Sequence, residues 1–297
     1  MVGDLVYYGL QRAAGGLRHA PPPAPYFRAV RDIASDLQRA GVSLEGARLM
    51  EVGTGRGLEV PMGLYLCGAA AVHTYDLYRI LLDWRIDAML SYFAAQSAAV
   101  ADELAPFSAG GAAGVLERIR SLTAGQPSAA EAIRRMGIHY YAPADAAASG
   151  LPDGSIDAQI SFTVFEHIPG EIIERILREA SRVLRPGGVT VHHIDLSDHF
   201  AHEDGSISLV NFLQYPQKEW DRIAGNRYAY HNRLRVTPMH NHFRAAGHEI
   251  LWHTTWRDER SERELRNGLR VAPEYARQSV EELATVGSRV VSAPRRG

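Results

Sequence analysis

Two acids and three glycines are spaced regularly in the first third of the chain. The apolar run RLMEV has Glu51 as its fourth residue. A second apolar run, AVHTYDL, has Asp76 near its end. The glycines between them are Gly53, Gly55 and Gly57. Glycine lets the backbone pass close to a ligand, and the amides of a following helix N-terminus can point at that ligand. This spacing indicates a site for a nucleotide-like ligand.

The charge of Glu51 indicates which kind of nucleotide-like ligand would bind. A dinucleotide site of the form G-x-G-x-x-G would need glycine at position 58, where this chain has Leu58. A carboxylate at the end of the first strand would repel a pyrophosphate, but it would favour a ligand that carries an ammonium and a sulfonium. Asp76 is placed to accept hydrogen bonds from ribose hydroxyls. S-adenosylmethionine meets both requirements, and the alternative is a glycine turn with two structural acids in another α/β protein.

The elements around this turn predict the fold. Strand, glycine turn, helix and strand follow one another in RLMEV, PMGLYLCG and AVHTYDL, which is how a doubly wound sheet begins. Further strands are expected in GIHYYAPAD, IDAQISFTVFEHI, GVTVHHIDL, HEILWHTTW and SRVVSAP, with a helix in GEIIERILREASRVL and a turn at RPGG. We predict an α/β fold with a doubly wound, Rossmann-like, seven-stranded sheet, a helical N-terminal segment and substrate-side insertions.

The domain boundaries follow from composition. Residues 1–45 are expected to form an N-terminal helical cap segment, in which APPPAP turns the chain between two short helices. Residues 46–297 are expected to form the main domain. Insertions are expected at about 98–137, as a helical cap, and at 197–236, which is rich in aromatic and charged residues. Pro61 should delay or kink the start of the helix after the glycine turn.

Taken together, these motifs resemble those of class I S-adenosylmethionine-dependent methyltransferases over residues 46–196 at least. EVGTGRG resembles the family's E/D-x-G-x-G-x-G loop, PADAAASGLPDGSIDAQISFTVFEHI its third-strand aspartate and fourth strand, and VLRPGG the turn before its fifth strand. The resemblance implies that the methionine part of the cofactor lies among Glu51, Gly53, Gly55 and Gly57, the ribose at Asp76, the adenine amino group at Asp145, and the pocket floor at Phe162. It also implies that Thr54, Leu77 and Ala146 belong to the cofactor site.

Imidazoles and carboxylates follow the fourth and fifth strands, in FEHIP and HHIDLSDHFAHED. A sulfonium methyl is already activated, so the protein mainly has to hold the nucleophile in line at ~3 Å and exclude water. An alcohol also needs its proton removed during attack, by a side chain or with the help of a metal. The candidate catalytic residues are His199, His167, His193, Asp195 and Asp198.

Each candidate has a structural alternative. His167 is part of an EH pair that is common in this superfamily, and it could simply order the turn after the strand. His192 and His193 are adjacent on a strand, so they face opposite sides and at least one of them is structural.

His199 is the leading candidate for the base, with Asp195 or Asp198 as its orienting partner. The spacing of His199 and His202, with aspartates nearby, could also suit a metal. No expected helix brings these two imidazoles onto one face. We therefore expect a protein base and no metal.

The insertion at 197–236 interleaves aromatic side chains with arginines. This composition suits a sugar ring or an aromatic scaffold, with arginine available for a carboxylate or phosphate. The alternative is that the aromatic residues only pack the segment onto the sheet. The sequence NRLR could precede a helix that is capped by Thr237, with Pro238 at its first position.

Composition narrows the partners and the compartment. A net charge of -2 and a pI near 6.7 give no general attraction to nucleic acid or to an anionic membrane. SFTV also stands where enzymes that methylate base amines have an NPPY-type tetrapeptide. The single cysteine, the absence of a signal-like N-terminus and the lack of a long apolar run predict a cytoplasmic protein. A homodimer is compatible with the sequence.

The expected function is methylation of a small-molecule acceptor. The runs GTG…P.GLYL.GA, IDLSDHF, NFL and NRLR resemble those of bacterial methyltransferases encoded near glycan and natural-product genes. We therefore expect O-methylation of a sugar or natural-product hydroxyl, assisted by a His/Asp base. The alternatives are N- or carboxyl-methylation by proximity, methylation of RNA or protein, and a protein of this fold that binds the cofactor without transferring methyl.

Overall fold

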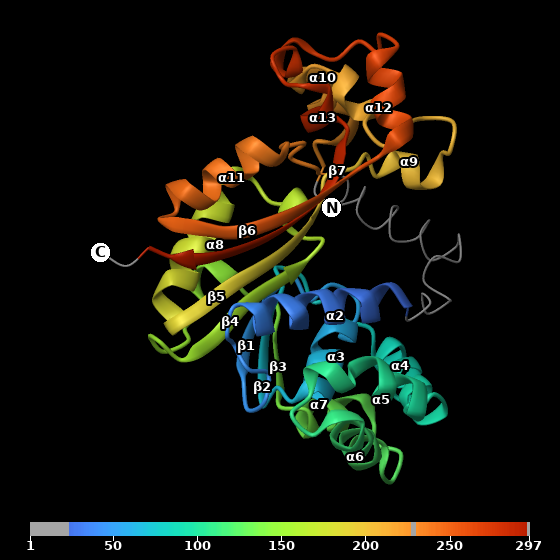
Figure 1. The fold of residues 1–297 in the computed structure, drawn as a ribbon, viewed down its shortest axis with the longest axis vertical. Coiled ribbons are helices and arrows are strands. Elements are labelled where there is room, and N and C mark those ends of the chain that lie inside the picture. Colours follow the sequence, from blue (N-terminus) through green and yellow to red (C-terminus); the bar gives the residue numbers. More distant parts are fainter. Residues whose placement is uncertain (1–23, 227–229, 296–297) are drawn as a thin grey trace.

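The computed structural model describes residues 24–226 and 230–295 (Figure 1). Most of the expected cap segment 1–45, together with Arg227 and Tyr228 of the second insertion, lies outside the described residues. Seven strands form one sheet in the order β3-β2-β1-β4-β5-β7-β6. They are β1 (Arg48–Val52), β2 (Ala71–Tyr75), β3 (Ile138–Tyr141), β4 (Ile156–Phe162), β5 (Leu184–Asp195), β6 (His248–Arg257) and β7 (Thr285–Pro294).

The topology of the sheet places the site. Strands β1 to β5 pair in parallel, and β7 is antiparallel to both β5 and β6. The strand order reverses between β1 and β4, and in open α/β sheets ligands bind beyond the carboxyl ends of the strands at such a switch point. The predicted fold class is confirmed.

Helices cover both faces because the strand residues alternate. Leu49 packs into a core that includes α2 (Ala24–Arg39) and α3 (Glu59–Cys67). Its neighbour Met50 packs on the opposite face against α8 (Gly170–Val183) and α11 (Val236–Ala245). The stripe of α8 that meets the sheet has helical spacing and consists of Ile173, Ile176, Leu177 and Ala180.

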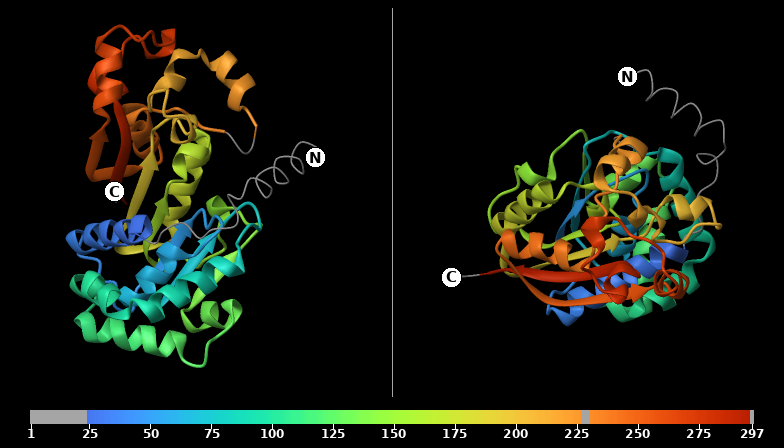
Figure 2. Two further views of the ribbon diagram at one scale, coloured as in Figure 1. Left: turned by 90° about the vertical axis from the view of Figure 1, so that its right-hand side faces the viewer. Right: turned by 90° about the horizontal axis from the view of Figure 1, so that it is seen from above.

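Two helical groups extend the sheet at opposite ends of the molecule (Figures 1 and 2). Four helices lie beside the β3 edge and share the core of α2 and α3: α4 (Asp83–Ala95), α5 (Ser97–Leu104), α6 (Gly111–Thr123) and α7 (Ala129–Arg135). At the other end lie α9 (Phe200–Glu203), α10 (Gln217–Ala224), α12 (Glu259–Arg266) and α13 (Val280–Leu283). Several residues of this second group form a separate apolar cluster.

Three local predictions are corrected or refined by the structure. The segment RPGG belongs to β5 as an irregularity, because the pairing of β4 with β5 shifts register between Ile156 and Ala158. Helix α11 begins at Val236 and is not capped by Thr237, whose hydroxyl donates to Glu282 Oε2 at 2.9 Å. Helix α3 begins at Glu59, so Pro61 falls in its first turn, where proline is tolerated. Within the described residues, no helix is long and apolar enough to cross a membrane.

Candidate active site

The loop between β1 and α3 is fastened to the end of β2. The amide of Gly53 donates to the carbonyl of Tyr75 at 2.8 Å, and the amide of Gly55 donates to Asp76 Oδ2 at 2.8 Å. Gly53 has a φ of +82°, and a Cβ there would lie 2.4 Å from Val164 Cγ2. Glycine is therefore required at position 53 both for its backbone conformation and for the close approach of Val164.

Glu51 is buried beneath this loop. Thr74 Oγ1 donates to Glu51 Oε2 at 2.5 Å and also lies 2.6 Å from Thr54 Oγ1. Burial raises the pKa of Glu51 to about 8, and the nearby carboxylates of Glu59 and Asp76 act in the same direction. At neutral pH the free protein therefore holds Glu51 protonated, and a cationic ligand would favour its ionised form.

A pocket of about 400 Å³ opens over the loop, and we call it the glycine-loop pocket. It brings together many of the residues that the sequence predicted for the cofactor: Glu51, Gly53, Thr54, Gly55, Gly57, Asp76 and Phe162. His167, one of the candidate catalytic residues, also lines it. The carboxylate of Asp76 is anchored by the amides of Gly55 and Tyr78, so its position is fixed before any ligand binds.

Three predicted cofactor residues lie outside the lining of this pocket. The side chain of Leu77 is 61% exposed. Asp145 caps the short turn that follows it by accepting from the amide of Ala147 at 2.8 Å, and Ala146 is buried in the core of α8. Their part in cofactor binding stays a prediction.

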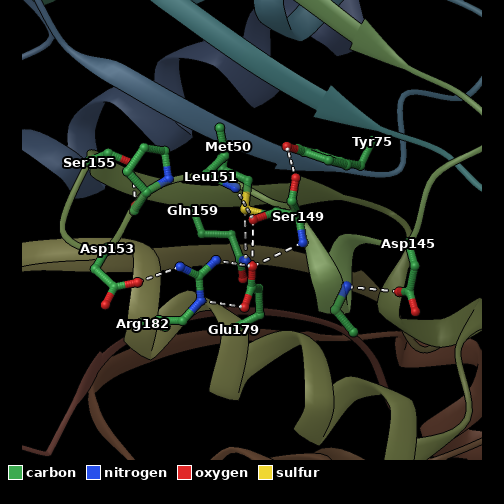
Figure 3. A network of polar contacts seen from close by, with 12 residues as sticks. Met50, Tyr75, Asp145, Ser149, Leu151, Asp153, Ser155, Gln159, Glu179 and Arg182 are labelled. Atoms are coloured by element: carbon green, nitrogen blue, oxygen red, sulfur yellow. Dashed lines mark hydrogen bonds and ion pairs between the residues drawn. The ribbon is translucent and has the colours of Figure 1, made fainter.

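The segment that carries Asp145 is tied to β2 and α8 (Figure 3). The hydroxyl of Tyr75 donates to the carbonyl of Ser149 at 3.0 Å. The amide and hydroxyl of Ser149 both donate to Glu179 Oε1, and Arg182 joins Glu179 to Asp153. These contacts hold the connection between β3 and β4 in a single arrangement next to the end of β2.

Sequence reasoning missed one wall of the glycine-loop pocket. Arg85 Nε donates to Glu59 Oε1 at 2.8 Å, and Arg85 Nη2 donates to the hydroxyl of Tyr26 at 2.9 Å. All three residues line the pocket, although they come from α4, α3 and α2. The only local signal was a glutamate at the start of the helix after the glycines. The partners of Glu59 are remote in the sequence.

A second group of polar side chains lies beyond the ends of β4 and β5, and we call it the imidazole cluster. It consists of Glu166, His167, Asp195, His199, His202 and His231. The ring centroid of His199 lies 4.9 Å from that of His167 and 5.0 Å from those of His202 and His231. The structure thus brings three of the predicted catalytic residues together, namely His167, Asp195 and His199.

Asp195 is the acid that organises one side of the cluster. It accepts hydrogen bonds from the amide and hydroxyl of Ser197, and its Oδ2 lies 3.6 Å from His199 Nε2 and 3.8 Å from His202 Nε2. Burial would raise the pKa of Asp195, but the contacts with His199 and Ser197 outweigh burial and lower it to about 2. Asp195 therefore lies beside His199, and its role as the orienting partner stays a prediction. Asp198 instead accepts from the amide of Phe200 at 2.9 Å.

His192 and His193 face opposite sides of β5, as predicted. The ring of His192 stacks on Phe165 at 4.1 Å, whereas the ring of His193 lies 5.5 Å from that of Phe162. Burial lowers the pKa of His193 to about 4, so it is neutral at physiological pH. His192 is structural, and His193 lies apart from the imidazole cluster.

Glu166 and His167 are held by an asparagine that comes from far along the chain. Asn232 Nδ2 donates to the carbonyls of Phe165 and Ile168 at 2.7 and 2.8 Å. His167 Nδ1 lies 2.8 Å from the carbonyl of Tyr230 and donates to it, which leaves the lone pair on Nε2. Glu166 is fully buried, and no side chain among the described residues hydrogen-bonds its carboxylate oxygens. Burial raises its pKa well above the usual value, although the backbone amides of Glu166 and Asp195 act in the opposite direction.

A second pocket of about 370 Å³ adjoins the first, and the two share Phe162 and Thr163. The second pocket is lined by Phe162, Thr163, His193, Ile194, Asp195, Ser197, Leu209, Trp256 and Val286. Thr163 has a φ of +52°, a strained conformation for a β-branched residue and one that is typical of functional sites.

Trp256 forms an aromatic wall of the second pocket. It pairs across the strands with Gly287, where a Cβ would lie 2.1 Å from the indole. The indole therefore lies against bare backbone, and it remains 45% exposed. This pairing of β6 and β7 could not be read from the sequence.

Two arginines of the second insertion, Arg233 and Arg235, donate to backbone carbonyls and pack the insertion. Arg233 Nη1 donates to the carbonyls of Phe212 and Tyr215, and Arg235 Nη1 donates to the carbonyl of Leu196 at 2.7 Å. Both guanidinium groups are buried, as are the rings of Phe212 and Trp220. For these residues the packing alternative is correct.

Comparison with known protein families finds one match, which lies in the middle of the chain. A family model described as "Methyltransferase domain" matches residues 116–192, from within α6 to β5. The matched residues make up about a quarter of the chain. With the sheet topology, this match confirms the resemblance to class I S-adenosylmethionine-dependent methyltransferases, and with it the predicted enzyme class and cofactor. The matched span includes Asp145, Glu166 and His167, whereas the glycine loop precedes it.

Several solved structures of methyltransferases are similar to this chain. Geranyl diphosphate C-methyltransferase from Streptomyces coelicolor A3(2) is 12% identical, with a TM-score of 0.48 over 89% of this chain and 79% of that one. Magnesium protoporphyrin IX methyltransferase from Synechocystis PCC 6803 is 11% identical, with a TM-score of 0.44 over 91% and 83%. An S-adenosylmethionine-dependent methyltransferase from Mesorhizobium loti is 17% identical, with a TM-score of 0.44 over 87% and 95%. No curated protein sequence matches the chain.

Proposed function

We propose that this methyltransferase acts on a hydroxyl group of a small molecule that binds in the second pocket. One observation carries the proposal: the imidazole cluster reaches both pockets. His167 lines the glycine-loop pocket, where the cofactor would bind, and Asp195 lines the second pocket. A hydroxyl at the junction, beside Phe162 and Thr163, would meet a methyl donor on one side and proton acceptors on the other.

The chemistry follows from that arrangement. A lone pair of the hydroxyl oxygen forms the new C–O bond in line with the C–S bond, which breaks and leaves its electron pair on sulfur. The sulfonium thus becomes a thioether, and the hydroxyl proton passes to a base. In this proposal His199 takes the proton, and the ionised Asp195, which lines the second pocket, orients it. An acceptor packed against the half-buried Phe162 would itself exclude water from the reacting atoms.

The lining of the second pocket favours an acceptor with a flat apolar body. Trp256 and Phe162 present aromatic surface, and Leu209 and Val286 add aliphatic surface. An aromatic ring stacked on the indole is worth about 0.5–1.5 kcal/mol beyond its buried area. A natural-product hydroxyl on a ring system therefore fits this pocket better than a simple sugar.

The test is transfer of labelled methyl from S-adenosylmethionine to a panel of hydroxylated ring compounds. His199→Ala should lower turnover by roughly 10²- to 10⁴-fold, because an unactivated alcohol is a poor nucleophile. Cofactor affinity, measured by calorimetry, should hardly change. Trp256→Ala should mainly raise KM for the acceptor, by up to about tenfold.

His242→Ala serves as the matched control, since its imidazole also contacts a carboxylate, that of Glu174, and lines neither pocket. Wild-type turnover in His199→Ala and His167→Ala alike would mean that proximity is sufficient. The acceptor would then be an amine, a carboxylate or an acidic phenol. If the protein bound S-adenosylmethionine but transferred methyl to no acceptor, it would be a cofactor-binding protein of this fold rather than a methyltransferase.

A further inference from the structure

We propose that Glu166, His167 and His199 bind a divalent transition-metal cation at the junction of the two pockets. Each of these side chains offers one ligand atom, and the three atoms lie within 4.8 Å of one another. The sequence predicted no metal, but that expectation concerned the spacing of His199 and His202. Binding of the cation can be judged by itself, whereas its use in methyl transfer rests on the proposed function.

The spacing of the three groups is close to what a cation requires. Ligand atoms at ~2.1 Å from an ion lie about 3.4 Å apart in a tetrahedral site. In an octahedral site they lie about 3 Å apart when adjacent and about 4.2 Å apart when opposite. Small rotations of the two imidazoles would bring the observed set into that range. No hydrogen bond joins the three groups to one another: His167 Nε2, for example, lies 4.0 Å from Glu166 Oε1.

Glu166 supplies the strongest reason for a cation. Its carboxylate is fully buried, and no side chain among the described residues hydrogen-bonds either oxygen; the groups that favour its ionised form are backbone amides, its own and that of Asp195. A buried carboxylate without a partner is costly, and such groups are normally paired or bound to a metal. The residue is also held in place, because the amide of Asn232 donates to the carbonyl of Glu166 at 2.8 Å. The fold therefore keeps this acid, without a hydrogen bond from any described side chain, pointing at two imidazoles.

The two histidines are oriented as metal ligands usually are. His167 donates from Nδ1 to the carbonyl of Tyr230, which directs the Nε2 lone pair towards the other ligands. Asp195 Oδ2 lies 3.6 Å from His199 Nε2, an arrangement like the carboxylate–histidine pairs that support metal sites. Asp195 would then support the site without binding the ion directly.

The ligand set indicates the kind of cation. Two imidazoles and one carboxylate, with the remaining positions open, suit Mn²⁺, Fe²⁺, Co²⁺ or Zn²⁺ better than Mg²⁺ or Ca²⁺, which prefer oxygen ligands. An acceptor hydroxyl in an open position would have its pKa lowered by the ion and would lose its proton to solvent. In this state the ion, rather than the His199 imidazole, activates the hydroxyl.

The experiment measures cation binding directly. Chelator-treated protein is titrated with Mn²⁺, Co²⁺, Zn²⁺ and Mg²⁺ by calorimetry, and Co²⁺ binding is also followed by its visible absorption. The wild-type protein should bind one Co²⁺ or Zn²⁺ per chain, and Mg²⁺ more weakly. Glu166→Gln, His167→Gln and His199→Gln should each weaken binding by at least about tenfold, since losing even a supporting residue costs 10- to 100-fold.

His242→Gln is the matched control. His242 Nδ1 lies 3.0 Å from Glu174 Oε1, so it has an imidazole–carboxylate contact of the same kind but is not part of the group of three. This variant should bind the cations as the wild type does. Thermal unfolding of each variant distinguishes loss of the cation site from loss of the fold. His199→Gln changes a half-exposed side chain and leaves the buried Glu166 unchanged, so this variant is expected to fold.

The inference is overturned if none of the transition-metal ions binds with a Kd below 1 mM, or if the three variants bind as tightly as the wild type. Calorimetry with S-adenosylmethionine and the methyl-transfer assay are run on the same samples. Cation binding without methyl transfer would contradict the proposed function alone. Methyl transfer that is unaffected by chelation, in a protein that binds no cation, would contradict this inference alone.

Discussion

The glycine-loop pocket and the imidazole cluster are built in opposite ways. The pocket is assembled mainly from neighbouring segments, β1, its loop and the end of β2, and its polar groups are largely paired with one another, as Gly55 is with Asp76. The cluster draws on three segments between Glu166 and His231, and no side chain in the described part of the chain hydrogen-bonds its buried acid. The polar groups of the glycine-loop pocket are held in place before a ligand binds. In the imidazole cluster, the charge of the buried Glu166 would have to be neutralised by a proton or a cation. Cofactor binding and acceptor chemistry should therefore fail separately.

The largest effect should follow a change at Gly53. In Gly53→Val the backbone would have to keep a φ of +82°, which is unfavourable for a branched residue, and the new Cβ would meet Val164 Cγ2 at 2.4 Å. The loop should move, and the affinity for S-adenosylmethionine should fall by at least about 30-fold, given ~1–3 kcal/mol each for strain and overpacking. Calorimetry with the cofactor measures this loss.

Gly41→Ala is the control that introduces backbone strain outside the cofactor site. Gly41 also has a positive φ, of +77°, but an added Cβ there would meet nothing within 4 Å. This variant should lose only about 1–2 kcal/mol of stability and bind the cofactor normally. Near-normal cofactor binding by Gly53→Val would contradict the idea that the loop is fixed beforehand. Cation binding at the imidazole cluster should survive in both variants.

The same contrast explains what could be predicted from the sequence. The glycines, Glu51 and Asp76 could be recognised because their roles depend on the order of adjacent elements, which local patterns reveal. Trp256 and Gly287 meet only through the pairing of β6 with β7, and Glu59 is explained only by Arg85. Such contacts leave no periodic signal in the sequence.

The arginines of the second insertion show the limit of composition. Aromatic and guanidinium groups in alternation fit a ligand lid and a packed segment equally well. Arg233 and Arg235 are buried because backbone carbonyls, such as that of Leu196, accept from them. Backbone acceptors cannot be identified from residue types, so the sequence left both interpretations open.

A smaller loss is expected for Asp76→Ala. Removing a charged partner of a ligand hydroxyl costs about 1.5–3 kcal/mol, which is tenfold to a hundredfold in cofactor affinity. The amide of Gly55 would also lose its acceptor. Asp145→Ala is the comparison, because Asp145 caps a turn outside the pocket lining and should cost less than Asp76→Ala. Equal losses in calorimetry would mean that Asp145 reaches the cofactor, and an unchanged Asp76→Ala would remove Asp76 from the site.

The smallest effect should be a dependence of cofactor affinity on pH. Burial raises the pKa of Glu51 to about 8, so below that pH the free protein carries a proton that a bound cation would displace. Binding of S-adenosylmethionine should therefore release a proton, and affinity should rise with pH and level off above about 8. Between pH 7 and pH 8 the ionised fraction of a group with this pKa grows by about fivefold, which sets the expected gain in affinity.

Adenosine, which carries neither the ammonium nor the sulfonium, should bind without this dependence. In Glu51→Gln the dependence should disappear for S-adenosylmethionine as well, because no proton is left to displace. A pH profile for Glu51→Gln that parallels the wild type would assign the titration to another group, and a flat profile in the wild type would mean that Glu51 stays protonated beneath the cofactor. In the second case the acid would serve the hydrogen bond from Thr74 and the shape of the loop, and the charge argument for a sulfonium ligand would be lost.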